Sequence, residues 1–209
     1  MFQTTFNKER IINMGNKDWN ITSEDDRPIH VALFISRNKD NASLENYVER
    51  RKSFITKEAV DSDTIKNEFM NFVKRGLDGE MSRLYFSVNE RDGDKISKSL
   101  LHFLIDNPSF NLCSIKSKIA GIAAEKHNAK TKKWMFDFDI NDYSSVEEFC
   151  HDIKSIDENV EIDIHRTPNG YAIITSRGFD TRELFKKWTE NVELKRDDLL
   201  CVDWKKNQI

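Results

Sequence analysis

Short apolar or alternating runs mark out strands along most of this chain, and apolar residues at helical spacing mark out the segments between them. The runs predict strands at residues 30–36, 83–91, 134–140, 160–167, 171–175 and 199–204. The helical spacing predicts helices at residues 57–75, 94–106, 112–130, 144–156 and 180–188. The first 28 residues have few apolar positions and are expected to form a polar leader.

The chain from residue 132 onward has the most regular pattern. Its predicted elements follow the order strand, helix, strand, strand, helix, strand, which is typical of ferredoxin-like and RRM-like units. Asn169 and Gly170 lie between two of these strands and favour a tight hairpin. We therefore expect an α+β fold, with a leader at 1–28, an N-terminal α/β part at 29–131 and a C-terminal RRM-like βαββαβ unit at 132–209. The last two parts are expected to pack into one domain.

The strand period of two assigns side chains to the two faces of this unit. Phe136 and Phe138 are expected to face the helices, which places Asp137 and Asp139 on the other, open face. The same parity places Asp203 of the last predicted strand on the open face. Three carboxylates at close range repel one another, so this cluster favours a bound cation. Mg²⁺ and Mn²⁺ prefer such oxygen ligands, and two ions can align a triphosphate with an attacking hydroxyl.

Composition and charge exclude few partners. The chain has 209 residues, of which 33% are charged, and a formal net charge of -3, so nucleic acid would have to be met by a local basic patch. No apolar run is long enough to span a membrane. We therefore expect no membrane partner and a cytoplasmic location, in a bacterium or a phage-infected cell. The three cysteines are widely spaced, and this favours neither a zinc ribbon nor a disulfide framework.

Several segments together resemble the archaeo-eukaryotic primase (primase-polymerase) superfamily, in its small phage-type form. Residues 134–140 resemble the first motif, hhhDhD, in which h is a hydrophobic residue. Residues 166–175 resemble the second motif region, a glycine-containing hairpin that enters a strand. Residues 200–203 resemble the third motif, hhD, and residues 83–92 resemble the strand that precedes the helical segment. The resemblance covers roughly residues 80–205.

This resemblance implies a primase-like fold and template-directed nucleotidyl transfer from NTP or dNTP with two divalent metal ions, Mg²⁺ or Mn²⁺. The catalytic and metal-binding residues would be Asp137, Asp139 and Asp203. The nucleotide would be bound at the predicted hairpin and the strand before it, by His165, Arg166, Thr167, Asn169 and Gly170. The partners would be a nucleoside triphosphate, a single-stranded nucleic-acid template and a helicase or another replication protein.

One position departs from the family pattern. The second motif has a histidine in the strand after the glycine, and this chain has Ala172 there. In one interpretation His165, on the same face of the neighbouring strand, replaces that histidine. In the other, nucleotidyl transfer has been lost, and the fold remains as a module that binds nucleotide, nucleic acid or a protein partner in a phage or mobile-element setting, for regulation or counter-defence. The missing histidine and the acidic net charge favour the second interpretation.

Basic, aromatic and amide side chains provide candidate nucleic-acid contacts outside these motifs. Such side chains suit phosphates and bases, although they are equally typical of a solvated surface. The candidates are Arg83, Tyr85, Asn89 and Arg91 on one face of the strand predicted at 83–91, and Lys132 and Lys133 in a basic link.

A phosphatase of the haloacid-dehalogenase type is a remote alternative. Its support is the Asp-x-Asp spacing of Asp137 and Asp139. The predicted hairpin at Asn169 and Gly170 indicates antiparallel strands, whereas that chemistry requires a parallel sheet.

Overall fold

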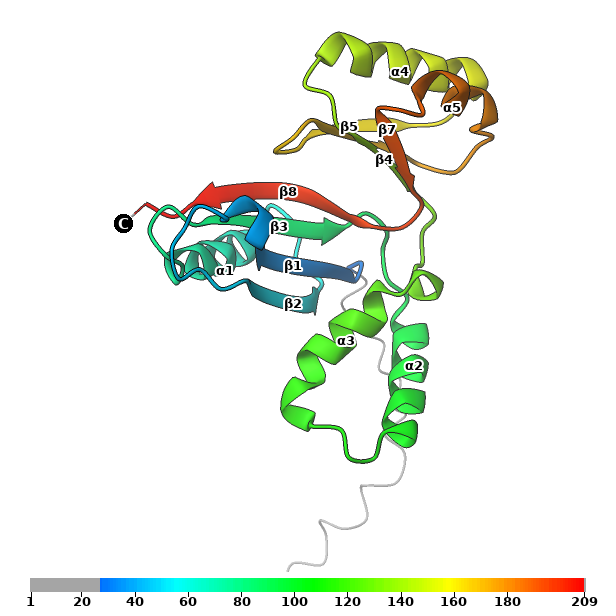
Figure 1. Cartoon of the computed structure of the whole chain (residues 1–209). Coiled ribbons are helices and arrows are strands. Elements are labelled where there is room, and N and C mark those ends of the chain that lie inside the picture. Colours follow the sequence, from blue (N-terminus) through cyan, green and yellow to red (C-terminus); the bar gives the residue numbers. More distant parts are fainter. Residues whose placement is uncertain (1–26, 209) are drawn as a thin grey trace, which may run out of the picture.

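The computed structural model describes residues 27–208, which form two antiparallel four-stranded sheets and five α-helices (Figure 1). The strands are β1 (His30–Ser36), β2 (Arg50–Thr56), β3 (Met81–Ser87), β4 (Trp134–Phe138), β5 (Ile162–Arg166), β6 (Tyr171–Thr175), β7 (Val192–Lys195) and β8 (Leu199–Lys206). The first sheet has the order β2-β1-β3-β8 and the second has the order β5-β6-β4-β7. The predicted α+β class is confirmed. Nearly all of the predicted leader at 1–28 lies outside the described residues.

Helices cover one face of each sheet, and three short 3₁₀ turns lie in the connections between elements. The helices are α1 (Asp63–Lys74), α2 (Gly93–Asp106), α3 (Ile115–Ala124), α4 (Tyr143–Ile156) and α5 (Arg182–Trp188); the 3₁₀ turns are η2 (Asn38–Asp40), η3 (Leu112–Ser114) and η4 (Lys126–Asn128). None of the helices in residues 27–208 is long and apolar enough to cross a membrane.

The first sheet is built around apolar side chains of β1 and β3. Phe34 and Leu84 are buried against α1, where Phe69 contributes a fully buried ring. Helix α1 begins later than predicted because the hydroxyl of Ser62 accepts a hydrogen bond from the backbone N–H of Ile65 and caps the helix. Helices α2 and α3 form a hairpin that packs at the end of this sheet, away from the second sheet (Figure 1).

The second sheet and its helices form a βαββαβ unit, in which all elements except the last strand match the prediction. Helices α4 and α5 lie on the outer face (Figure 1). Phe136, Phe138 and Ile173 are fully buried in one core cluster with Phe149 of α4 and Trp188 of α5. The alternation in β4 therefore has the predicted direction, with its phenylalanines toward the helices.

The closing strand of this unit is not the predicted one. The sequence predicts residues 199–204 in that place, but β8 pairs with β3 of the first sheet, and β7 lies beside β4. Strand β7 has only four residues, and its mixed apolar and charged pattern is too short to stand out in the sequence. The chain leaves the unit after Lys195 and returns to the first sheet, so Asp203 lies there as well.

Two other strands differ from the prediction. Strand β2 is not predicted, because it is an edge strand that begins with three basic residues. Strand β3 ends at Ser87, so Asn89 and Arg91 lie beyond it.

Strand β8 lies against the second sheet. The face of that sheet without helices packs on it, with Met135, Ala172 and Ile174 in contact with Leu200 and Val202. Ala172 is only 1% exposed, so this face is not the open surface that the sequence predicts. Burial of these apolar side chains stabilises the contact between the sheets. Cavities remain on both sides of β8.

Candidate functional site

A cleft of about 140 Å³ between the two sheets brings together charged residues from distant parts of the chain. The first sheet and the turn after β1 contribute Arg37, Arg83, Tyr85 and Cys201, and the second sheet and its hairpin contribute Asp137, Asp139, Lys195, Thr167 and Asn169. Pockets that enclose whole drug-sized ligands have roughly 300–1,000 Å³. The enclosed part of this cleft is therefore suited to a compact charged group.

Two arginines share one carboxylate at the first-sheet side of the cleft. The Nε and Nη2 atoms of Arg37 donate hydrogen bonds to Asp40 at 2.9 and 3.0 Å, and Nη2 of Arg83 donates to the same carboxylate at 2.6 Å. Burial alone would raise the pKa of Asp40, but the hydrogen bonds from both guanidinium groups outweigh this effect and lower the pKa. Asp40 therefore stays ionised, and the group of three carries one net positive charge.

Arg83 has a hydrogen-bond donor without a partner. The residue is 7% exposed, and its Nε–H is buried with no hydrogen-bond acceptor among the residues of the described chain. A buried donor left unpaired costs about 1–3 kcal/mol. Arg83 also lines the cleft, so an anionic ligand bound there would meet its guanidinium group.

The carboxylates of Asp137 and Asp139 lie on the opposite side of the cleft. Nζ of Lys195, on the neighbouring strand β7, donates to Oδ2 of Asp137 at 2.8 Å. Burial alone would lower the pKa of Lys195, but the bond to Asp137 raises it, so the amine is protonated at neutral pH. Asp139 follows β4 directly and is exposed. It forms no ion pair with any described residue.

The hairpin between β5 and β6 packs on the end of β4 because residue 170 is glycine. A Cβ atom at Gly170 would lie 2.1 Å from the carbonyl oxygen of Phe138, which no side chain permits. Thr167 closes the hairpin, because its hydroxyl accepts a bond from the N–H of Gly170 at 3.2 Å. This close approach brings Thr167 and Asn169 to the same cleft as Asp139.

The structure does not assemble the predicted group of Asp137, Asp139 and Asp203. Because β8 belongs to the first sheet, Asp203 lines a different pocket, with His165 and Arg166, and pairs with Lys205 at 3.3 Å. Within residues 27–208, no group of three or more His, Cys, Asp or Glu side chains is placed to hold a metal ion. The carboxylates available to a cation in the cleft are those of Asp137 and Asp139.

No histidine of the described residues lines the cleft. Ala172 pairs with Asp137 on one side and with His165 on the other, as the strand parity predicts. However, His165 lines the cavities on the other side of β8. Arg166 is exposed, and its guanidinium lies 4.7 Å from the centre of the Tyr171 ring. Neither side chain reaches the cleft.

The predicted nucleic-acid face at 83–91 is divided between two environments. Arg83 and Tyr85 line the cleft, whereas Asn89 and Arg91 are 1% and 2% exposed. Arg91 donates to both oxygens of Asp197, at 2.8 and 3.0 Å, and Asn89 bonds to the same carboxylate at 3.1 Å. The prediction of one exposed stripe is therefore wrong, because Asn89 and Arg91 connect buried loops. Of the two link residues, Lys132 is exposed and Lys133 is half-buried.

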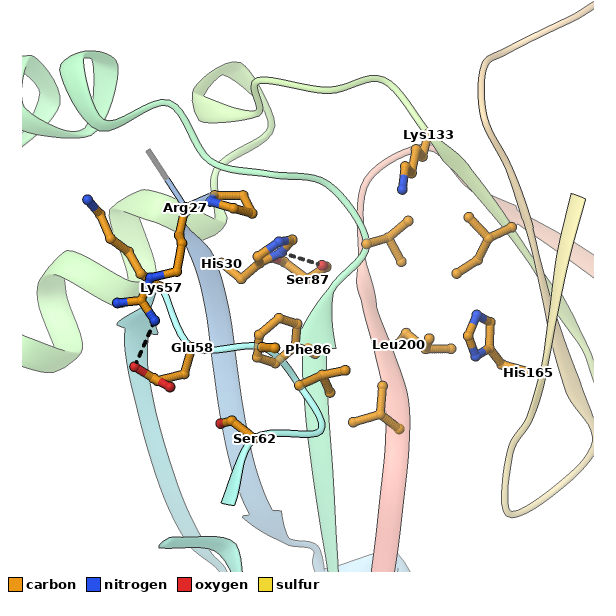
Figure 2. Close-up of a pocket in the computed structure, with 16 residues that line it drawn as sticks. Arg27, His30, Lys57, Glu58, Ser62, Phe86, Ser87, Lys133, His165 and Leu200 are labelled. Carbon is orange, nitrogen blue, oxygen red and sulfur yellow. Dashed lines mark hydrogen bonds and ion pairs between the residues drawn. The ribbon is translucent and has the colours of Figure 1, made fainter. Parts of the chain in front are cut away.

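A second cavity, of about 550 Å³, has Leu200 and Val202 of β8 in its wall (Figure 2). His30, Lys133 and His165 project toward it from three different segments (Figure 2). Burial lowers the pKa of His30, whose ring bonds to Ser87 and packs 4.9 Å from the ring of Phe86. The apolar part of the wall is formed mainly by Phe86, Val88, Ile174, Leu200 and Val202. This cavity suits an apolar ligand and lacks the carboxylate pair of the cleft.

Three residues in or beside the cleft were not predicted from the sequence, namely Arg37, Asp40 and Lys195. The spacing of Arg37 and Asp40 after a buried strand is a local signal for an ion pair within a turn. It does not show that Arg83 bonds to the same aspartate. Cys201 was expected to be a buried small side chain, and its burial raises the pKa of the thiol to about 11. It is therefore not a nucleophile at neutral pH.

No protein-family model matches the chain, and no curated protein or solved structure is significantly similar to it. Its function is therefore argued from the geometry of the cleft.

Proposed function

We propose that this chain binds the phosphate groups of a nucleoside triphosphate in the cleft between the two sheets, together with a divalent cation. The main support is the group of three cationic side chains, Arg37, Arg83 and Lys195, that line the cleft together. Guanidinium groups match the geometry of phosphate oxygens, and hydrogen bonds between charged groups are stronger than neutral ones. The small enclosed volume suits phosphates, so the sugar and base would lie outside it.

The pair of carboxylates fits a single cation bound with the phosphates. Mg²⁺ usually takes one or two protein carboxylates and completes its shell with water and phosphate oxygens. Asp137 and Asp139 supply that number of ligands. When bound, the cation would neutralise part of the phosphate charge.

Lys195 and Asp137 form an ion pair whose two members can exchange partners when a phosphate and a cation bind. The two groups are 2.8 Å apart, and both line the cleft. A phosphate and a cation that enter together offer Lys195 an anion and Asp137 a cation. Each of these half-buried charges then keeps a partner, which avoids the cost of leaving a charge isolated.

Isothermal titration with ATP and MgCl₂ tests this proposal. We expect Arg83→Met to weaken ATP binding at least tenfold, because each lost factor of ten corresponds to about 1.4 kcal/mol and a charged hydrogen bond contributes about 1.5–3 kcal/mol. Asp139→Asn should weaken ATP binding more in the presence of Mg²⁺ than in its absence. Asp203→Asn is the matched control, since this carboxylate lines another pocket. Equal losses in Asp139→Asn and Asp203→Asn would contradict the proposal.

Nucleotidyl transfer of the primase type is the second candidate function. Its support is the shared position of Asp137 and Asp139 beside three cationic side chains, in a chain whose motifs resemble those of primases. Among residues 27–208, no histidine lines the cleft, and its lining carboxylates are only Asp137 and Asp139, because Asp40 beside it is bonded to Arg37 and Arg83. This favours the first candidate instead.

The assay for transfer is incorporation of labelled NTP or dNTP on a single-stranded template with Mn²⁺. Incorporation that Asp137→Asn abolishes would support the transferase. No incorporation together with normal ATP binding would leave a nucleotide-binding module. The phosphatase alternative has no structural support, because both neighbours of β4 are antiparallel to it.

A further inference from the structure

A separate pocket of about 360 Å³ has a basic lining. It lies between α2 and η4, the link at 129–132 and the turn from β7 to β8. The charged lining includes Lys95, Lys126, Lys132, Arg196 and Asp197, with Trp134 beside them. None of its lining residues also lines the cleft.

The positive charges of this pocket are mostly uncompensated. Lys126, Lys132 and Arg196 form no ion pair with any residue in the described part of the chain, whereas Lys95 lies 3.4 Å from Asp92. Asp197 is the acidic residue of the lining, and both of its oxygens are bonded to Arg91. In a chain with a net charge of -3, such a local basic patch indicates an anionic partner.

Arg196 is held in place before any ligand binds. Its guanidinium carbon lies 5.2 Å from the centre of the Trp134 ring, within the range of a cation–π contact. Gly178 and Phe179 pack against the same tryptophan: a Cβ at Gly178 would lie 2.3 Å from the ring, and the Phe179 ring centre is 6.0 Å away. The next residue, Asp197, fixes the turn through its buried bonds to Arg91. Ordering a side chain in advance lowers the entropy cost of binding.

We infer that this pocket binds the phosphate backbone of single-stranded nucleic acid. Two lysines and one arginine, all exposed, line the same pocket, and a flexible single strand can adapt its phosphates to such a group of charges. The rest of the chain has a net negative charge, so this patch should account for most of the binding. The inference is independent of ATP binding in the cleft, because the two sites have different residues.

Fluorescence anisotropy of a labelled oligothymidine tests this inference. Each phosphate contact on a single strand lowers the slope of log K, the association constant, against log salt concentration by about 0.7. Three contacts therefore predict a slope of about -2.1. This slope corresponds to a roughly 20-fold loss of affinity between about 50 and 200 mM salt. In the double variant Lys126→Gln/Lys132→Gln, the slope should fall to about -0.7, with a loss of only about threefold over the same range. Circular dichroism would show that the variant is folded.

Two control variants distinguish binding at this pocket from binding elsewhere on the protein. Arg51→Gln removes an exposed charge on β2 that lines none of the pockets described above, and it should leave the slope unchanged. Arg83→Met should weaken ATP binding at least tenfold and leave oligothymidine binding unchanged. Undetectable oligothymidine binding, or an unchanged slope in the double variant, would overturn the inference. Equal competition by polyglutamate would overturn the assignment to nucleic acid.

Discussion

Arg83 and Arg91 provide a matched pair of substitutions that separates binding from stability. Both are buried, both pair with an aspartate, and both have an Nε–H without a hydrogen-bond partner among the described residues. They differ in position, because Arg83 lines the cleft and Arg91 does not. Replacing each with methionine keeps an apolar chain of similar length and removes the charge.

The structure predicts different stability losses for the two variants. In Arg91→Met, Asp197 loses two bonds and keeps one from Asn89, and its side chain is only 3% exposed. Leaving the buried carboxylate of Asp197 without its ion-pair partner costs about 3–5 kcal/mol of folding free energy. In Arg83→Met, Asp40 keeps both bonds from Arg37, so the loss is about 1.5–3 kcal/mol, the value of one charged hydrogen bond.

Urea unfolding and ATP titration measure the two effects on the same samples. Arg91→Met should be the less stable variant and should bind ATP with unchanged affinity, provided that it is measured well below its unfolding midpoint. Arg83→Met should be the more stable variant and should bind ATP at least tenfold more weakly. Equal losses of ATP affinity in both variants would refute the reasoning, because the effect would then follow from stability alone.

Three further predictions concern the residues around the cleft. Gly170→Ala should destabilise the protein by about 1–3 kcal/mol and weaken ATP binding, because the new Cβ would collide with the backbone of β4. Gly121→Ala in α3 is the control, because no atom lies within 4 Å of the added Cβ, and it should stabilise the protein by about 0.5–1 kcal/mol. Urea unfolding measures both changes. Asp40→Asn should cost about 3–5 kcal/mol at neutral pH. The lowered pKa of Asp40 means that this stability is present above the unfolded pKa of about 4 and is lost as the pH falls through the folded value, so unfolding curves of wild type and variant should converge in acid. Iodoacetamide should modify the exposed Cys113 much faster than Cys201, whose pKa is raised to about 11 by burial, and equal rates by mass spectrometry would contradict the packing around β8.

Local signals in the sequence were sufficient to predict the first five elements of the second unit, but not its closing strand β7. Phe136 and Phe138 alternate with Asp137 and Asp139, and this fixes which face of β4 packs against the helices. Asn169-Gly170 marks the hairpin, and Gly170 is also required for the close approach to β4. Both features depend on a few neighbouring residues, so they can be recognised without knowledge of the rest of the fold.

The position of β8 could not be predicted in the same way. Leu200 and Val202 alternate with polar or small residues, and this pattern suits the edge of either sheet. The choice depends on contacts with residues more than a hundred positions away, in β3. The composition of the cleft follows from this choice, because β8 places Asp203 outside it and brings Cys201 beside Arg83. The roles of Asp40 and Lys195 likewise depend on strand pairing rather than on local sequence.

The most direct test of nucleotide binding in the cleft is a crystal structure with Mn²⁺ and a non-hydrolysable ATP analogue. The proposed function predicts an anomalous Mn²⁺ peak at the carboxylates of Asp137 and Asp139. It also predicts phosphate oxygens within hydrogen-bond distance, about 2.7–3.2 Å, of Arg83 and Lys195. Phosphates in the large cavity beside His30, or a Mn²⁺ ion at another site with the cleft left empty, would contradict the proposed function.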